Sequence, residues 1–237
     1  MKSMFYAANE RGQANHGWLN AHHSFSFGEF YNPEKVHFGA LRVLNDDLVG
    51  GGGGFPTHPH DNMEIVTIPL SGAIVHKDST GGNGIIKTGD VQIMSAGSGV
   101  RHSEYNASPN QTLNLLQIWV FPKERNIKPR YDQKTFNISD RKNKWQTVVG
   151  ADENDGGLWI NQDAVFALVD LDNEQLISYQ PKFSGNGVYF FVIDGNAEIN
   201  EKALEKKDAL GVWDIEEIQI KATSDTKLLA IEVPMLK

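Results

Sequence analysis

Residues 50–66 read GGGGGFPTHPHDNMEIV, a glycine run followed by two histidines separated by one residue. On an extended strand, side chains two residues apart point to the same face, so His58 and His60 would project together and converge on one ion. A histidine-rich polar loop after the glycines is the alternative interpretation of this pair by itself. The choice depends on what the rest of the chain offers as ligands.

A second pair of possible ligands follows about forty residues later, in SAGSGVRHSEYN at residues 95–106. His102 and Glu104 again stand two residues apart, directly after a glycine-rich turn that would begin a strand. The two pairs together supply three imidazoles and one carboxylate, a set that suits a divalent first-row metal and leaves coordination positions open. The chain has no cysteine, so thiolate metal sites and disulfides are excluded.

Short β-rich runs separated by Gly, Asn, Asp and Pro clusters make up most of the 237 residues, and a sustained helical period is hardly found. Turn sequences such as Ser71-Gly72 and Asp194-Gly195-Asn196 stand between apolar runs, where tight antiparallel connections need a positive φ. The pattern predicts an all-β protein built as a sandwich or small barrel. Residues 200–208 fit either a short helix or a strand, turn and strand.

The β-rich runs form two sets, joined by a charged, proline-containing connection at residues 122–157. We therefore predict an N-terminal metal-binding domain at residues 1–135 and a second domain at residues 136–237. His102 is the last histidine of the chain, so the second domain is predicted to lack a metal site of the same kind.

Composition excludes several classes of function. The chain carries 22 basic and 30 acidic residues, a formal net charge of -8, which has the wrong sign for direct binding to nucleic acids or anionic membranes. Its apolar runs are far shorter than the roughly 20 residues of a membrane helix. The first residues do not resemble a secretory signal peptide, so we expect a cytoplasmic protein.

The sequence resembles the pirin family, in particular the bacterial members described as quercetin 2,3-dioxygenase-like. The resemblance is nearly continuous over residues 16–131, and the segments that carry it are HGWLNAHHSFSFGEFYNP (16–33), HFGALRVLNDD (37–47), GFPTHPHDNMEIVTIPLSG (54–72), IKTGDVQIMSAGSGVRHSEYN (86–106) and LLQIWVFP (115–122). WINQDAVFALVDL (159–171) resembles the family's second cupin more weakly. The resemblance implies a bicupin, with two antiparallel β-barrel domains of jelly-roll type.

Carried over to this chain, the family pattern makes His58, His60, His102 and Glu104 the metal ligands. Fe(II) is the expected metal, with Mn, Ni, Co, Cu or Zn as alternatives. Many cupins have a ligand glutamate four residues after the His-x-His pair, and Glu64 occupies that place here. We assign the ligand and proton-acceptor role to Glu104. Glu64 is placed in the pocket wall or directly behind the ligands, as the reserve catalytic carboxylate.

The resemblance implies a metal-dependent dioxygenase that cleaves flavonol-like aromatic substrates with O₂. The alternatives are a non-catalytic, metal- or redox-responsive regulator that binds a protein partner, and another reaction of the cupin fold. The residues do not separate these functions.

Overall fold

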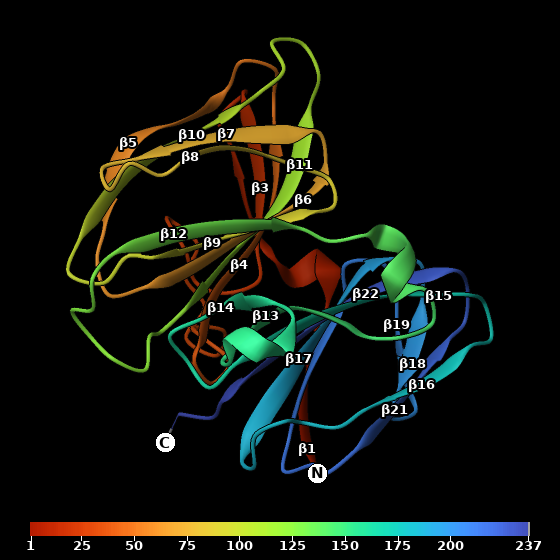
Figure 1. Ribbon diagram of the computed structural model, residues 1–237. Coiled ribbons are helices and arrows are strands. Elements are labelled where there is room, and N and C mark those ends of the chain that lie inside the picture. Colours follow the sequence, from red (N-terminus) through yellow and green to blue (C-terminus); the bar gives the residue numbers. More distant parts are fainter. Residues whose placement is uncertain (237) are drawn as a thin grey trace.

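The computed structural model describes residues 1–236, which fold into two stacked lobes of β-structure (Figure 1). These residues contain 22 strands and three short 3-10 turns, and no α-helix. The turns are η1 (Ala8–Glu10), η2 (Ile138–Arg141) and η3 (Glu153–Asp155). None of the described residues forms a helix long and apolar enough to cross a membrane.

The first lobe pairs a seven-stranded sheet with a four-stranded sheet. The larger sheet has the order β12 (Arg130–Thr135), β9 (Asp90–Ser95), β6 (Glu64–Ser71), β11 (Leu113–Val120), β4 (Leu41–Val49), β3 (Leu19–His23) and β2 (Gly12–Asn15). The smaller sheet has the order β5 (Gly54–His60), β10 (Val100–Asn106), β7 (Ala73–Asp78) and β8 (Asn83–Lys87).

The second lobe repeats this arrangement. Its larger sheet has the order β1 (Lys2–Tyr6), β20 (Ala209–Trp213), β17 (Asn186–Asp194), β22 (Thr226–Pro234), β15 (Val165–Leu171), β13 (Gln146–Gly150) and β14 (Leu158–Trp159). Its smaller sheet has the order β16 (Leu176–Tyr179), β21 (Ile218–Ala222), β18 (Ala197–Ile199) and β19 (Lys202–Leu204). Residues 200–208 therefore hold a turn and a strand rather than a helix.

The all-β bicupin architecture predicted from the sequence is confirmed, with one correction. Each lobe is a jelly-roll-like sandwich of two sheets and not a closed barrel. The two larger sheets also pack against each other between the lobes, which gives four layers. Strand β17 shows why: Tyr189 and Phe191 belong to the core between the lobes, whereas Val188 and Phe190 face the interior of the second lobe. A strand buried on both faces reads as a continuous apolar run.

The first strand does not follow the predicted division of the chain. Residues 1–135 were predicted to form one domain, but β1 pairs with β20 along its whole length and lies among the blue strands of the lower lobe in Figure 1. The connection at 122–157 likewise contains strands of both lobes, because β12 pairs with β9 and β13 pairs with β15. Pairing between strands so far apart in the chain leaves no local signal in the sequence.

Candidate metal centre

Three histidines meet on neighbouring strands of the smaller sheet of the first lobe. His58 on β5 is the register partner of His102 on β10, and His60 lies two residues further along β5. One ring nitrogen from each lies within 4.8 Å of the others. The strands approach closely because Gly54 has no side chain: a Cβ there would lie 2.5 Å from the carbonyl oxygen of Glu104. The strand period of two and the pairing of β5 with β10 therefore place His58, His60 and His102 side by side.

The ring nitrogens of this cluster are available to a metal. Both nitrogens of His102 are buried and have no hydrogen-bond partner among residues 1–236. His58 Nδ1 donates to the carbonyl of Pro56 at 2.8 Å, which leaves the lone pair of Nε2 free. Burial is the largest cause that lowers the pKa of His60 and of His102, each to about 4. Neutral imidazoles with unpartnered nitrogens fit a divalent cation.

Glu104 belongs to the same interior, but hydrogen bonds hold its carboxylate to one side. Its Oε2 accepts from Gln117 Nε2 at 2.8 Å, and its Oε1 accepts from Gln92 Nε2 at 3.3 Å. One carboxylate oxygen groups with nitrogens of His102 and His76 within 4.8 Å, rather than with the other two histidines. The structure thus brings the three predicted histidines together and sets Glu104 beside His102.

His76 and Asp78 on β7 support Glu104 from behind. His76 Nδ1 lies 3.9 Å from Glu104 Oε1, and its Nε2 lies 3.0 Å from Asp78 Oδ2. The His76 ring stacks on Tyr131, with ring centroids 4.5 Å apart. Burial alone would lower the pKa of His76, but the carboxylates of Glu104 and Asp78 raise it. For the acidic Glu104 the effect of burial is the opposite, because burial alone would raise its pKa. His76, His102 and a hydrogen bond from Gln92 hold the pKa of Glu104 below its usual value.

A row of polar side chains crosses the inner face of the larger sheet, facing the histidines. The row runs through five strands in register and consists of His23, Asn45, Gln117, Thr67 and Gln92. Its hydrogen bonds join His23 to Asn45 at 2.8 Å, Thr67 to Gln117 at 3.1 Å and Gln92 to Thr67 at 3.2 Å. Two members of the row hold Glu104. The row therefore fixes the orientation of the carboxylate.

The sequence interpretation missed this polar row. Its signal is a single polar residue at an inward position of an otherwise apolar strand, as in LLQIWV (115–120) and EIVTIPL (64–70). In the sequence such a residue looks like an ordinary buried polar side chain with a hydrogen-bond partner in the core. Only the register of the five strands shows that these residues form one row.

A cavity of about 380 Å³ lies between the two sheets of the first lobe. His58, His60, His102 and Glu104 all line it, together with an aromatic wall. Trp119 meets the His60 ring edge-on with centroids 4.9 Å apart, and Phe27 meets Trp119 in the same way at 5.4 Å. A cavity of this size, with an apolar and aromatic wall and a few convergent polar groups, is typical of a small-molecule binding site.

Glu64, the predicted reserve carboxylate, does not line this cavity. It is fully buried on the opposite face of β6, where it accepts from Ser95 Oγ at 2.7 Å and from the backbone N–H of Asn161 at 3.1 Å. The strand breaks between His60 and Glu64, with Asn62 at φ 47°, so the shared face assumed for an unbroken strand does not exist. Glu64 faces the second lobe instead.

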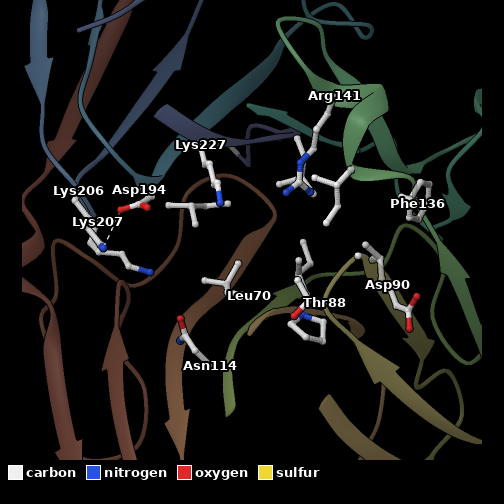
Figure 2. A pocket seen from close by; sticks show the side chains of 17 residues that line it. Leu70, Thr88, Asp90, Asn114, Phe136, Arg141, Asp194, Lys206, Lys207 and Lys227 are labelled. Carbon is white, nitrogen blue, oxygen red and sulfur yellow. Dashed lines mark ion pairs between the residues drawn. The ribbon is translucent and has the colours of Figure 1, made fainter. Parts of the chain in front are cut away.

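A second cavity, of about 280 Å³, lies between the lobes, with Arg141 and Lys227 reaching toward it from the second lobe's side (Figure 2). Most of its cations are already paired. Arg141 pairs with Asp170 at 3.0 Å, Lys206 with Asp194 at 2.8 Å and Lys207 with Asp46 at 3.0 Å. These ion pairs join elements of the fold, so the cavity lined by the three histidines is the better candidate for function.

The fold and the site together define a bicupin whose first lobe carries a histidine cluster suited to one metal ion. Comparison with family models agrees: residues 5–120 match the Pirin model, and residues 147–233 match the quercetinase C-terminal cupin domain. The chain belongs to the pirin family.

The similar proteins include named relatives and proteins of solved structure. The chain is 44% identical to a quercetin 2,3-dioxygenase of Escherichia coli over 96% of both chains, and 40% identical to a pirin-like protein of Caulobacter vibrioides over 93% of this chain and 95% of the other. It also resembles the crystal structure of the bacterial pirin YhhW of Escherichia coli in complex with nickel(II), with 41% identity, a TM-score of 0.93, and coverage of 99% of this chain and 100% of the other.

Proposed function

We propose that the first lobe holds one divalent first-row metal, Fe(II) in the native protein, on His58, His60, His102 and Glu104. The observation that carries this proposal is His102, a buried side chain whose two nitrogens have no partner in the described part of the chain, while two more imidazoles stand beside it. A buried polar group without a partner costs free energy, and a metal removes that cost. The similar Escherichia coli pirin has been crystallised in complex with nickel(II), which supports metal binding by this chain.

We further propose that the protein is a metal-dependent dioxygenase acting on flavonol-like aromatics. The metal, when bound, supplies the Lewis-acid and electron-transfer chemistry that oxygenation of an enolic substrate requires. Both atoms of O₂ enter the organic products in such a reaction, so no further oxidant or reductant is needed. The similar protein of Escherichia coli is named for this activity.

The protein's own residues have defined tasks in this reaction. Phe27 and Trp119 would hold a planar ring system and exclude water from the cavity. Glu104 would take the proton of the substrate's acidic hydroxyl, because its depressed pKa keeps it ionised and hydrogen bonds from Gln92 and Gln117 hold it in place.

The test is turnover of a flavonol under air. Protein reconstituted with Fe(II), and in parallel with Ni(II), should consume O₂ and quercetin together, with loss of the flavonol's near-ultraviolet absorbance. Full metal occupancy without flavonol-dependent O₂ uptake, across both metals and several flavonols, would contradict the dioxygenase proposal and favour the non-catalytic regulator or another reaction of the cupin fold.

A further inference from the structure

One carboxyl oxygen in the wall of the first-lobe cavity is buried without a hydrogen-bond partner in the described residues. Asp47 on β4 lines the cavity and is only 4% exposed. Its Oδ1 is fully buried, and no residue among 1–236 donates a hydrogen bond to it. Buried polar atoms are almost always satisfied, so an exception in a cavity wall calls for a ligand that completes it.

The neighbouring carboxylate, Asp46, is paired with basic side chains. Asp46 is also buried, yet it accepts hydrogen bonds from Arg11 at 3.4 Å and Asn114 at 2.8 Å and pairs with Lys207 at 3.0 Å. Its side chain points out of the cavity on the opposite face of β4, as the strand period requires. Asp46 is therefore satisfied by groups on the outer face of β4, whereas Oδ1 of Asp47, on the cavity side, has no partner among residues 1–236.

Asp47 lies on the opposite side of the cavity from the three histidines. It lies on the larger sheet, which faces the sheet that carries His58, His60 and His102. Asn45, two residues before it, lines the same cavity and is hydrogen-bonded to His23. Burial first, and then the carboxylates of Asp46 and Glu104, raise the pKa of Asp47 to about 8. The negative charges of the neighbouring carboxylates Asp46 and Glu104 favour a neutral ligand beside Asp47 over an anionic one.

We propose that Asp47, with the adjacent His23–Asn45 pair, forms a subsite that accepts a hydrogen bond from a neutral hydroxyl group of the substrate. The proposal rests on the proposed function, because it assigns the part of a flavonol that is not held at the histidines. It specifies the substrate class as aromatics that carry a further phenolic hydroxyl. A carboxyl oxygen accepts a hydrogen bond in either protonation state, so the contact does not require a particular charge on Asp47.

Equilibrium binding in the absence of O₂ tests the subsite separately from turnover. The nickel-loaded protein is titrated with quercetin and with 3-hydroxyflavone, which keeps the keto-enol group but lacks the other hydroxyls. We expect the wild type to prefer quercetin by about tenfold, the effect of one hydrogen bond to a buried group. The Asp47→Ala variant should lose most of this preference, because its affinity for quercetin falls while that for 3-hydroxyflavone hardly changes.

Two further variants keep the test specific. Asp47→Asn retains an acceptor oxygen in the same place and should keep most of the preference. Thr57→Val removes a hydroxyl elsewhere in the cavity wall and should leave the preference intact. Thermal unfolding provides a readout apart from binding: Asp47→Ala should unfold at a temperature no lower than the wild type, since no partner is left unsatisfied.

The possible outcomes decide the proposal. Equal affinity of the wild type for the two flavonols, binding of neither, or an unchanged preference in Asp47→Ala would each overturn the subsite. A marked loss of thermal stability in both Asp47 variants would assign Asp47 a structural role and overturn it too. Preferential binding of quercetin without turnover under air would retain the subsite and contradict only the dioxygenase.

Discussion

The interiors of the two lobes differ although their sandwiches have the same strand plan. The second lobe is filled by apolar side chains from both of its sheets, including Phe190, Val192 and Ile220. The corresponding space in the first lobe holds the polar row, the histidine cluster and a cavity, with only two small apolar clusters beside them. The comparison indicates that the second lobe contributes stability, whereas the first gives up packing to position chemical groups.

Buried carboxyl groups show the same difference. Glu232 in the second lobe is fully buried and accepts four hydrogen bonds, from the Tyr179 hydroxyl, the Asn186 amide and the backbone N–H groups of Lys182 and Phe183. Asp47 in the first lobe has a buried oxygen with no partner in the described chain. A satisfied buried group stabilises a fold, while an unsatisfied one is retained at a cost.

The largest effect should come from removing a histidine of the cluster. His102→Ala should abolish metal binding, because the ring that contacts both other histidines is lost. Elemental analysis of protein dialysed against excess metal checks this, with the exposed His16→Ala variant as the control. Metal content equal to the control's would contradict the assignment of the site.

Truncation of an aromatic residue should lower the free energy of unfolding more in the second lobe than in the first. Phe190→Ala should lower the free energy of unfolding by about 3–5 kcal/mol, since the side chain is fully buried in the second lobe. Phe55→Ala should cost about 1–2 kcal/mol, because that ring is only partly buried at the cavity. Urea denaturation of the metal-free proteins measures both. Similar losses would show that the first lobe is packed as tightly as the second.

The buried carboxyl group between the lobes should make stability depend on pH. Burial raises the pKa of Glu64 to about 7 from the ordinary 4.5. Between these pH values the folded protein keeps a proton that the unfolded chain releases, so the free energy of unfolding falls as pH rises, by roughly 3 kcal/mol in total. Glu64→Gln, which keeps an acceptor for the Asn161 N–H, should remove this part of the pH dependence. Parallel stability curves for wild type and variant would refute it.

The smallest effect concerns the polar row behind Glu104. Gln117→Leu removes the 2.8 Å hydrogen bond to Glu104 and should weaken metal binding by about 10-fold to 100-fold without abolishing it. Competition with a metal chelator measures the affinity, and Gln13→Leu on the exposed part of β2 is the matched control. An affinity equal to that of the control would show that the row is structural only.

The sequence by itself determined the local features of this protein. The strand period of two placed His58 with His60 and His102 with Glu104, and glycine-rich turns indicated antiparallel hairpins. These features depend on neighbours in the chain, so they could be predicted without a fold. The all-β class and the restriction of the histidine cluster to the first lobe followed from the same local evidence and from the position of the last histidine.

Tertiary structure decided everything that depends on strands far apart in the chain. It turned Glu64 toward the second lobe, because a break at residues 61–63 separates its strand from that of His60. It joined β1 to the second lobe and aligned Gln92, Thr67 and Gln117 into one row that holds Glu104. The physical reason is that the face on which a strand residue is buried is set by register and sheet packing, and these follow from contacts between distant segments.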